Sequence, residues 1–373
     1  MSPRTTIRSL QIEPLRIPFR ETFRHASAER SETSSLWVEA VSEGGAVGCG
    51  ECCPRPYVTG ETLESATRFF SLHEPSLREE VVDLPSLEAW MAAHPDELDA
   101  NPAAWCAIEL AFLDAMAKEA GQPMEALLGL PPLRGRFRYT AVLGDADRRV
   151  FHATAERYRG YGFTDLKMKL SGQADRDRDH LDILRQWGAE SIRLRVDANN
   201  LWTRADEAIT FLRALNYPFF AIEEPVRANQ LAELRDIGRA LDCRIVLDES
   251  FVRLAQLARL EDGPDRWLIN VRVSKMGGLL RSLVIVEAAR RSGIGLIVGA
   301  QVGETSLLTR AALTVAHASA ATLVAQEGAF GTLLLERDVC SPPLMFGVGG
   351  VLDVESFPQL KDPGLGLTFR VPA

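Results

Sequence analysis

A set of charged side chains stands where short apolar stretches of the chain end, at nearly regular spacing. In chain order these residues are Lys167, Lys169, Asp197, Glu223, Asp248 and Lys275. From Lys169 onward the intervals are all about 25 residues, which is the length of one strand, one helix and two loops. A single acid at such a place usually caps the next helix. Acids on three successive strands need another explanation.

The three acids, Asp197, Glu223 and Asp248, belong to neighbouring strands of the expected sheet. Because a closed barrel directs the ends of adjacent strands toward one shared space, the three carboxylates would meet and repel each other unless a cation lies among them. The set contains only oxygen ligands, and no His or Cys pair stands nearby. Such ligands favour a hard divalent ion, so we predict a Mg²⁺ site, with Mn²⁺ as an alternative ion.

The lysines would lie on both sides of this site. Lys167 and Lys169 are two residues apart, so both side chains face the same side of their strand, whereas Lys275 comes from four strands later, across the barrel. Positive charge nearby lowers the pKa of a lysine and lets it act as a base, and Lys167 would do this to Lys169. A cation between two bases suits removal of a proton α to a carboxylate, because the ion stabilises the resulting enolate. Solvated lysines at a sheet edge are the alternative, and a closed barrel has no edge.

These residues need a scaffold of alternating strands and helices. The apolar stretches that we interpret as strands are Tyr139–Leu143, Asp165–Leu170, Ile192–Asp197, Phe219–Glu223, Arg244–Asp248, Trp267–Val273, Gly295–Ala300 and Leu323–Glu327. Sustained strand–helix alternation predicts parallel strands. The fold class is therefore α/β, and a (β/α)₈ barrel of the TIM type is favoured. A doubly wound open sheet is the alternative, but no Gly-x-Gly-x-x-Gly follows a first strand.

The first 133 residues have a different pattern. Residues 7–18 and 35–51 alternate like strands, with turn residues at 43–45, and a helix is predicted from Asn101 to Gly121. We therefore predict a small α+β domain over residues 1–133 and the barrel over residues 134–340. The Pro- and Gly-rich segment 341–373 is expected to return and pack on the first domain.

Composition excludes several classes of function. The formal net charge is −9 and the pI is near 5.4, which disfavours nucleic acid as a partner. The chain has neither a long apolar run nor the apolar core of a signal peptide, which disfavours a membrane span and secretion. The six cysteines are scattered, and we expect reduced thiols in a cytoplasmic protein.

Taken in order, the motifs Lys-x-Lys, Asp-Ala-Asn, Glu-Glu-Pro, Asp-Glu-Ser and Ser-Lys-x-Gly-Gly resemble those of the enolase superfamily, and most closely its muconate-lactonizing-enzyme subgroup. The resemblance covers nearly the whole chain and implies that residues 1–133 form a capping domain. It implies Mg²⁺ held by Asp197, Glu223 and Asp248, with Lys169 and Lys275 as the opposed acid/base pair. Lys167 would tune Lys169 and touch the substrate carboxylate.

The same resemblance implies positions for residues next to the metal ligands and for the substrate contacts. Asn199 would lie behind the metal ligands. Glu224 and Glu249 are expected to point the other way on their strands. Substrate selectivity would come from two loops of the capping domain, here 19–30 and 52–62, and from the last barrel strands. The residues that we consider for substrate contact are Arg24, His25, Tyr57, Thr140, Gln301 and Glu327.

The substrate motifs point in more than one direction. The second loop resembles that of dipeptide epimerases, but the eighth-strand region lacks their Asp-x-Asp and looks more like the Glu-containing motif of muconate cycloisomerases. We therefore expect epimerisation, racemisation or cycloisomerisation of a small carboxylate, namely an amino acid derivative, a dipeptide or an unsaturated diacid. A β-elimination on the same scaffold is the alternative, and a non-enzymatic binding protein is disfavoured. The resemblance also suggests a homo-oligomer, either a dimer or an octamer.

Overall fold

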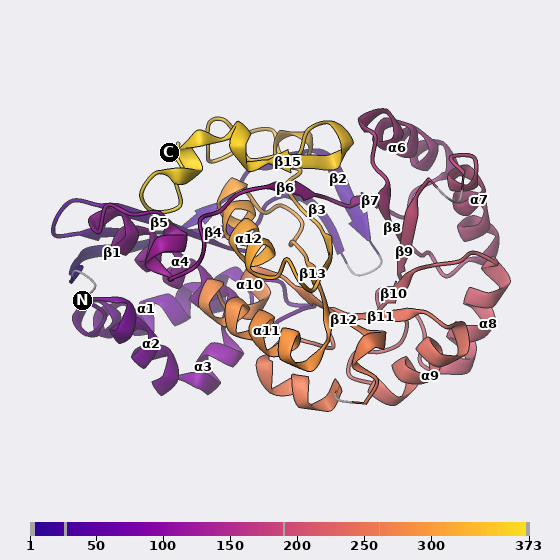
Figure 1. Cartoon of the computed structure of the whole chain (residues 1–373), viewed down its shortest axis with the longest axis horizontal. Coiled ribbons are helices and arrows are strands. Elements are labelled where there is room, and N and C mark those ends of the chain that lie inside the picture. The colour runs from indigo at the N-terminus through magenta and orange to yellow at the C-terminus, as the bar shows by residue number, and fades with distance from the viewer. Residues whose placement is uncertain (1–3, 26–27, 189–190, 261, 371–373) are drawn as a thin grey trace.

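The core of the molecule is a sheet of parallel strands that lie side by side in chain order, seen in a computed structural model that describes residues 4–25, 28–188, 191–260 and 262–370. Figure 1 shows these strands surrounded by their helices. The strands are β7 (Ala141–Leu143), β8 (Asp165–Lys169), β9 (Arg193–Asp197), β10 (Ala221–Glu223), β11 (Arg244–Leu247), β12 (Trp267–Val271), β13 (Gly295–Val298) and β14 (Leu323–Gln326). The backbone N–H of Thr140 donates to the carbonyl of Gln326 at 2.7 Å, which joins the first strand to the last. The predicted TIM-type barrel is confirmed.

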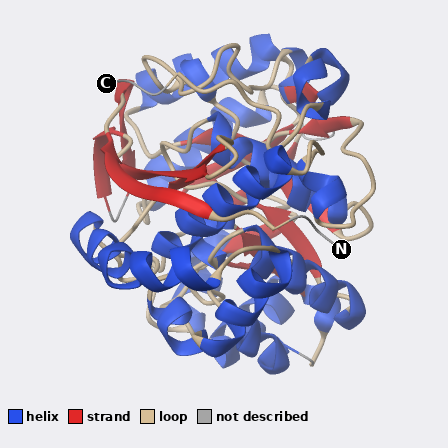
Figure 2. Ribbon diagram, turned by 90° about the vertical axis from the view of Figure 1, so that its left-hand side faces the viewer, coloured by secondary structure: helices blue, strands red, loops and turns tan. Residues whose placement is uncertain are grey.

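The barrel helices cover the outside of these strands, as the turned view in Figure 2 shows. They are α6 (Arg148–Tyr161), α7 (Ala174–Arg185), α8 (Ala205–Leu215), α9 (Leu231–Leu241), α10 (Val273–Met276), α11 (Leu279–Ser292) and α12 (Ser306–Ala318). Helix α6 begins where the Asp147 carboxylate accepts the N–H groups of Arg149 and Val150, a normal N-cap. The regular alternation fails between β11 and β12, where two 3₁₀ segments, Leu254–Leu260 and Pro264–Arg266, form the connection.

The first domain combines a three-stranded antiparallel sheet with helices. The sheet has the order β1 (Ile7–Leu15), β4 (Ser35–Ser42), β5 (Val47–Cys52). Strands β4 and β5 form a hairpin, and its turn contains the predicted turn residues 43–45. The helices are α1 (Leu63–Glu80), α2 (Leu84–Ala93), α3 (Pro95–Ala100), α4 (Pro102–Glu119) and α5 (Met124–Leu127). Strand β5 lies so close to α4 that a Cβ at Gly50 would be 1.9 Å from the carbonyl oxygen of Ala107. A second hairpin, β2 (Pro18–His25) and β3 (Ala28–Glu32), belongs to the predicted substrate loop.

The C-terminal segment contacts both parts of the molecule. Strand β15 (Val351–Asp353) pairs with β6 (Arg136–Arg138), which precedes the barrel. Farther on, the N–H of Leu365 donates to the Asp114 carboxylate of α4 at 2.7 Å. The Phe369 ring meets the Trp37 ring of β4 edge to face, with the centroids 5.1 Å apart. The segment therefore packs against the first domain and against the strand that enters the barrel.

Two expectations drawn from composition can be compared with the fold. All six cysteines are buried free thiols. In the described part of the chain, no helix is both long enough and apolar enough to cross a membrane.

Candidate active site

The charged residues of the sequence motifs converge at the carboxyl ends of the barrel strands. Lys169 lies opposite Asp197 in the β8–β9 register, and Asp197 lies opposite Glu223 in the β9–β10 register. The Lys169 ammonium contacts the Asp197 carboxylate and donates to Oδ1 of Asn199 at 2.9 Å. The backbone N–H of Asn199 in turn donates to Asp197 at 3.0 Å. Asn199 therefore orients both members of this pair.

Lys167 links the carboxylates of three different strands. Its Nζ lies 2.9 Å from Glu327, 3.3 Å from Glu223 and 3.6 Å from Asp197. The lysine is almost fully buried, with 2 % of its surface exposed. Burial by itself lowers the pKa of a lysine, but the three carboxylates outweigh it and raise the pKa of Lys167. Lys167 therefore stays an ammonium.

The opposite wall is formed by Asp248 and Lys275. The Lys275 Nζ lies 2.7 Å from Oδ1 of Asp248, and it also donates to the carbonyls of Asp248 at 2.8 Å and of Asn270 at 2.7 Å. Lys275 does not close a strand as predicted, because β12 ends at Val271 and Lys275 lies on the short helix α10. Burial lowers the pKa of Lys275. Burial is the main cause of this depression, and the charge of Arg272 adds to it.

The buried carboxylates respond to their surroundings in different ways. Burial raises the pKa of Glu223 to about 7, and the nearby Asp197 carboxylate adds to the effect. Burial also disfavours the ionised forms of Asp197 and Asp248. For these two, the cations in contact outweigh burial and lower the pKa: the lysines of β8 at Asp197, and Arg272 with Lys275 at Asp248. Glu223 is therefore the one acid of the three whose ionised form the neighbouring cations do not fully stabilise.

The acids can be compared with what a metal ion requires. In the described residues, no group of three or more His, Cys, Asp or Glu side chains is arranged ready to hold an ion, because lysine and arginine nitrogens contact the carboxylate oxygens. Lys167 nevertheless reaches both Asp197 and Glu223, and Arg272 contacts both Glu223 and Asp248. The three carboxylates are thus close neighbours, and their all-oxygen donor set fits a hard cation.

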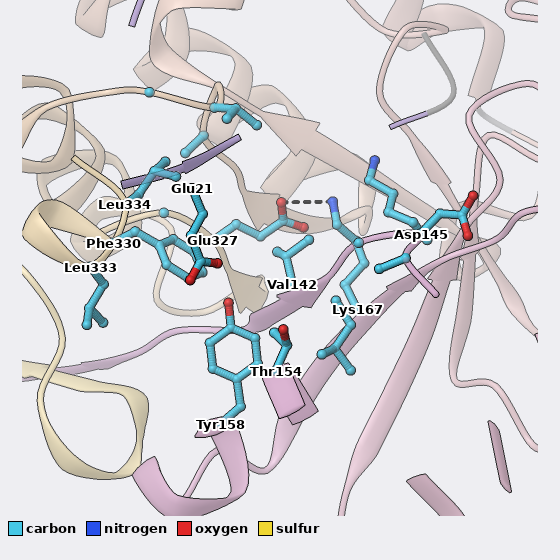
Figure 3. A pocket seen from close by; sticks show the side chains of 18 of the residues that line it. Glu21, Val142, Asp145, Thr154, Tyr158, Lys167, Glu327, Phe330, Leu333 and Leu334 are labelled. Atoms are coloured by element: carbon cyan, nitrogen blue, oxygen red, sulfur yellow. Dashed lines mark hydrogen bonds and ion pairs between the residues drawn. The ribbon is translucent and has the colours of Figure 1, made fainter. Parts of the chain in front are cut away.

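A cavity of about 660 Å³ opens above these residues. Lys167, Lys169, Asn199 and Arg272 contribute to its floor. Figure 3 shows Tyr158, Phe330, Leu333 and Leu334 on one side of the cavity and the Lys167–Glu327 ion pair nearer its centre. The apolar and aromatic lining residues include Val142, Val150, Phe151, Tyr158, Tyr161, Val302, Phe330, Leu333 and Leu334. The cavity thus combines a charged floor with an apolar wall.

The structure brings some of the expected substrate contacts to this cavity. Tyr57, Gln301 and Glu327 line it. Thr140 is not among the lining residues: it is buried and donates its hydroxyl hydrogen to Asp165 at 2.6 Å. The Thr140 hydroxyl is thus already bound inside the barrel, and Thr140 is not placed as a substrate contact. Lys275, Asp197, Glu223 and Asp248 are likewise absent from the lining: they are buried and contact, directly or through Asp248, the lining residues Lys167, Lys169 and Arg272. Arg24 and His25 lie at the end of β2, but their side chains are outside the described part of the structure.

Glu224 and Glu249, both expected to point away from the site, point in different directions. Glu224 turns away as expected, and its carboxylate accepts the N–H groups of Asp248 and Ser250, each at 2.7 Å. Glu249 lines the cavity instead, so the expectation that it points away is wrong. Strand β11 ends at Leu247, and the alternation of side chains ends with it.

Sequence reasoning missed two arginines of the site. Arg272 contacts Asp248 and donates to Oε1 of Gln301 at 3.0 Å. Arg195 is fully buried beneath the floor, where it pairs with Glu327 and with Asp165 at 3.1 Å. Arg195 could have been found, because it lies two residues before Asp197 and therefore faces the barrel interior.

Comparisons with known proteins identify the family to which this fold belongs. The model of the family described as "Enolase C-terminal domain-like" matches residues 150–373. The L-Ala-D/L-Glu epimerase of Bacillus subtilis is 29% identical over 367 residues, covering 96% of each chain, and its substrate-liganded structure has a TM-score of 0.85 at 26% identity over 98% of this chain and 99% of the other. A chloromuconate cycloisomerase of Cupriavidus pinatubonensis is 29% identical over 88% of this chain and 89% of its own.

A further solved structure contains both a metal and a ligand. The dipeptide epimerase of Enterococcus faecalis, complexed with Mg and the dipeptide L-Leu-L-Tyr, has a TM-score of 0.81 at 25% identity, covering 97% of this chain and 99% of the other. These relatives are isomerases that share the barrel and its capping domain. The family model matches more than half of the chain, and the protein therefore belongs to the enolase C-terminal domain-like family, among the isomerases of the enolase superfamily.

Proposed function

We propose that this protein removes and returns a proton α to a carboxylate with the help of Mg²⁺, and so epimerises or racemises an amino acid derivative. The observation that carries the proposal is the pair of buried lysines, Lys169 and Lys275, on opposite sides of three adjacent carboxylates. Bound by Asp197, Glu223 and Asp248, Mg²⁺ would offset the negative charge that develops on the substrate carboxylate. Mn²⁺ offers the same coordination chemistry.

The three lysines have different roles in this proposal. Lys275, whose pKa is lowered by burial, is suited to take a proton on one face of the α-carbon, and Lys169 serves the other face. Lys167, which remains an ammonium, is placed to hold the substrate carboxylate. Glu327 fixes Lys167 from one side and is itself held by Arg195. This arrangement gives two mobile protons and one fixed positive charge.

The lining of the cavity favours an amino acid derivative over a diacid. Glu249 and Glu304 both line it, and in the described residues neither forms an ion pair. Burial raises the pKa of Glu304 to about 7. Burial also raises the pKa of Glu249. The oxygens of both acids can accept N–H groups of a substrate, and neither acid supplies the positive charge that a second substrate carboxylate would need.

Two arginines of the cavity wall are already paired with acids. Arg176 lies 2.8 Å from Asp145, and Arg157 lies 3.7 Å from Glu21. The apolar wall then suits a neutral hydrophobic group. We therefore propose N-acylamino acids or dipeptides with an apolar side chain as the substrate class.

The test is exchange of the α-proton in D₂O, measured by NMR and mass spectrometry on recovered substrate. The panel contains hydrophobic dipeptides, N-acylamino acids and unsaturated diacids. We expect deuterium at the α-carbon together with inversion, and face-specific loss of exchange in Lys169→Ala and Lys275→Ala, because each base reaches one face only. Cyclised diacid would favour cycloisomerisation, and dehydrated product would favour β-elimination. Exchange of both enantiomers at wild-type rates in both variants would refute the assignment of the lysines.

We also propose a cellular location and an oligomeric state. Six unpaired thiols fit a cytoplasmic location. The dimer or octamer expected from the resemblance stays a prediction, which light scattering coupled to gel filtration measures directly.

A further inference from the structure

The capping domain contacts the short helix that carries Lys275 on both sides of the lysine. Before it, the N–H of Cys53 donates to Oγ of Ser274 at 3.0 Å. After it, the Glu109 carboxylate of α4 accepts the N–H of Leu279, and that of Leu280 at 3.3 Å, at the start of α11. The lysine therefore lies on a segment held from both ends by residues of the first 133.

Glu109 is an unusual residue for this place. Its side chain has no exposed surface, and burial raises its pKa to about 8. In the described residues it forms no ion pair, so its partners are the N–H groups at the α11 N-terminus. The charge of Arg281 opposes this rise only in part, and the hydrogen bonds of Glu109 are with the backbone that follows Lys275.

Gly278 of the sequence motif is explained by this contact. A Cβ at Gly278 would lie 2.2 Å from Oε2 of Glu109, and the residue has φ +97°. Only glycine lets the backbone approach the carboxylate so closely in this conformation. Gly278 thus serves the docking of Glu109, whereas Gly277 ends α10 in a left-handed conformation.

The other lysine has no comparable support. The side chain of Lys169 lies on β8, and its contacts within the described residues are with Asp197 and Asn199, both in the barrel. A change in the capping domain can therefore disturb one base and leave the other in place.

We propose that Glu109 is a positioning residue through which the capping domain places Lys275 for proton transfer on one face of the substrate. Glu109 holds the first turn of α11, this fixes the end of α10, and the Lys275 ammonium is thereby kept against the Asn270 carbonyl and Asp248. The inference rests on the proposed function, since it concerns the role of Lys275 as a base.

The experiment measures α-proton exchange for each enantiomer separately, with the two faces assigned from Lys169→Ala and Lys275→Ala. In Glu109→Ala we expect exchange on the Lys275 face to fall at least ten-fold, because misplacement of a reacting group by about 1 Å can cost a hundred-fold in rate. Exchange on the Lys169 face should stay within about two-fold of wild type. Glu109→Gln keeps an acceptor oxygen and should restore most of the lost rate.

The matched control is Asp114→Ala. Asp114 is also a fully buried carboxylate of α4 that accepts two N–H groups, that of Cys49 at 3.0 Å and that of Leu365 at 2.7 Å, but these belong to β5 and to the C-terminal segment. Its loss should lower thermal stability without a difference between the faces. Equal loss on both faces in Glu109→Ala, or no loss on either, overturns the proposal.

A crystal structure of Glu109→Ala decides the question independently of turnover. We expect the Lys275 Nζ to leave the Asn270 carbonyl while Lys169 keeps its contact with Asn199. An unmoved Lys275 overturns the inference even if no substrate is found. Absence of exchange in the wild-type protein across the substrate panel would instead count against the proposed function.

Discussion

At the scale of single residues, the site is a balance between three carboxylates and the cations around them. Asp248 illustrates it, because its two oxygens contact Lys275 and Arg272. A divalent ion among the acids would compete with these side chains for the same oxygens. Because Asp248 contacts Lys275 and would also bind the metal ion, a change of this carboxylate tests the metal site.

We expect Asp248→Asn to abolish stoichiometric Mg²⁺ binding, because the amide carries no charge to offset that of the ion. Isothermal titration calorimetry with Mg²⁺ measures the binding, and circular dichroism shows whether the fold is retained. The control is Asp145→Asn, a cavity residue paired with Arg176, which should bind Mg²⁺ as wild type does. Full retention of Mg²⁺ by Asp248→Asn would remove this residue from the metal site.

At the scale of elements, carboxylates of the first domain cap helices of the barrel. Glu51 of β5 accepts the N–H of Thr305 at 3.1 Å, at the start of α12, as Glu109 does for α11. Helix N-termini attract negative charge, yet burial is the larger effect here and raises the pKa of both acids to about 8. Docking of the two domains is thus coupled to protonation.

This coupling predicts a pH dependence of stability. The folded pKa of Glu51 is about 8 and its ordinary value is 4.5, so between these values the folded state binds the proton more tightly. The stabilisation of the folded state by the Glu51 carboxyl group is therefore complete below pH 4.5 and is lost as the pH rises through 8. One pKa unit corresponds to about 1.4 kcal/mol, so the loss is at most roughly 5 kcal/mol.

Glu51→Gln should flatten this dependence. Chemical denaturation between pH 5 and 9 measures the free energy of unfolding, and the variant should lose less stability than wild type over that range. Glu64→Gln, at an exposed position of α1, should follow the wild-type curve. A Glu51→Gln curve parallel to that of wild type would show that this carboxyl is not the titrating group.

At the scale of the whole molecule, a buried ion pair ties three separate parts together. Arg310 of α12 pairs with Glu125 of α5 at 2.8 Å and donates to the carbonyl of Leu365 in the C-terminal segment at 2.9 Å. Thr314 donates its hydroxyl hydrogen to the same glutamate at 2.7 Å. The barrel, the first domain and the C-terminal segment meet at this arginine.

We expect Glu125→Gln to destabilise the protein by about 3–5 kcal/mol, because it leaves the Arg310 charge buried without a counter-ion. Thermal and urea denaturation measure the change. The double variant Glu125→Leu/Arg310→Met removes both charges and should recover most of the stability. If the double variant is no more stable than the single one, packing rather than the unpaired charge limits stability here.

The barrel, its strands and most of its charged floor follow from patterns that are local in the sequence. Strand–helix alternation and the polar residue at each strand end are local properties, and burial on both faces of a parallel strand leaves a readable apolar run. Asp197, Glu223 and Lys169 were therefore predicted at their observed places. The predicted strands also agree with the observed ones within a few residues.

The positions of side chains beyond the strand ends depend instead on how the folded chain packs. Once β11 and β12 stop, alternation no longer says where a side chain points, so Glu249 turns into the cavity and Lys275 lies on a helix. Contacts between distant segments, such as Glu109 with Leu279, depend on how two domains dock. No spacing within the chain encodes that docking, because it arises from the shapes and charges of two surfaces whose residues lie far apart in the sequence.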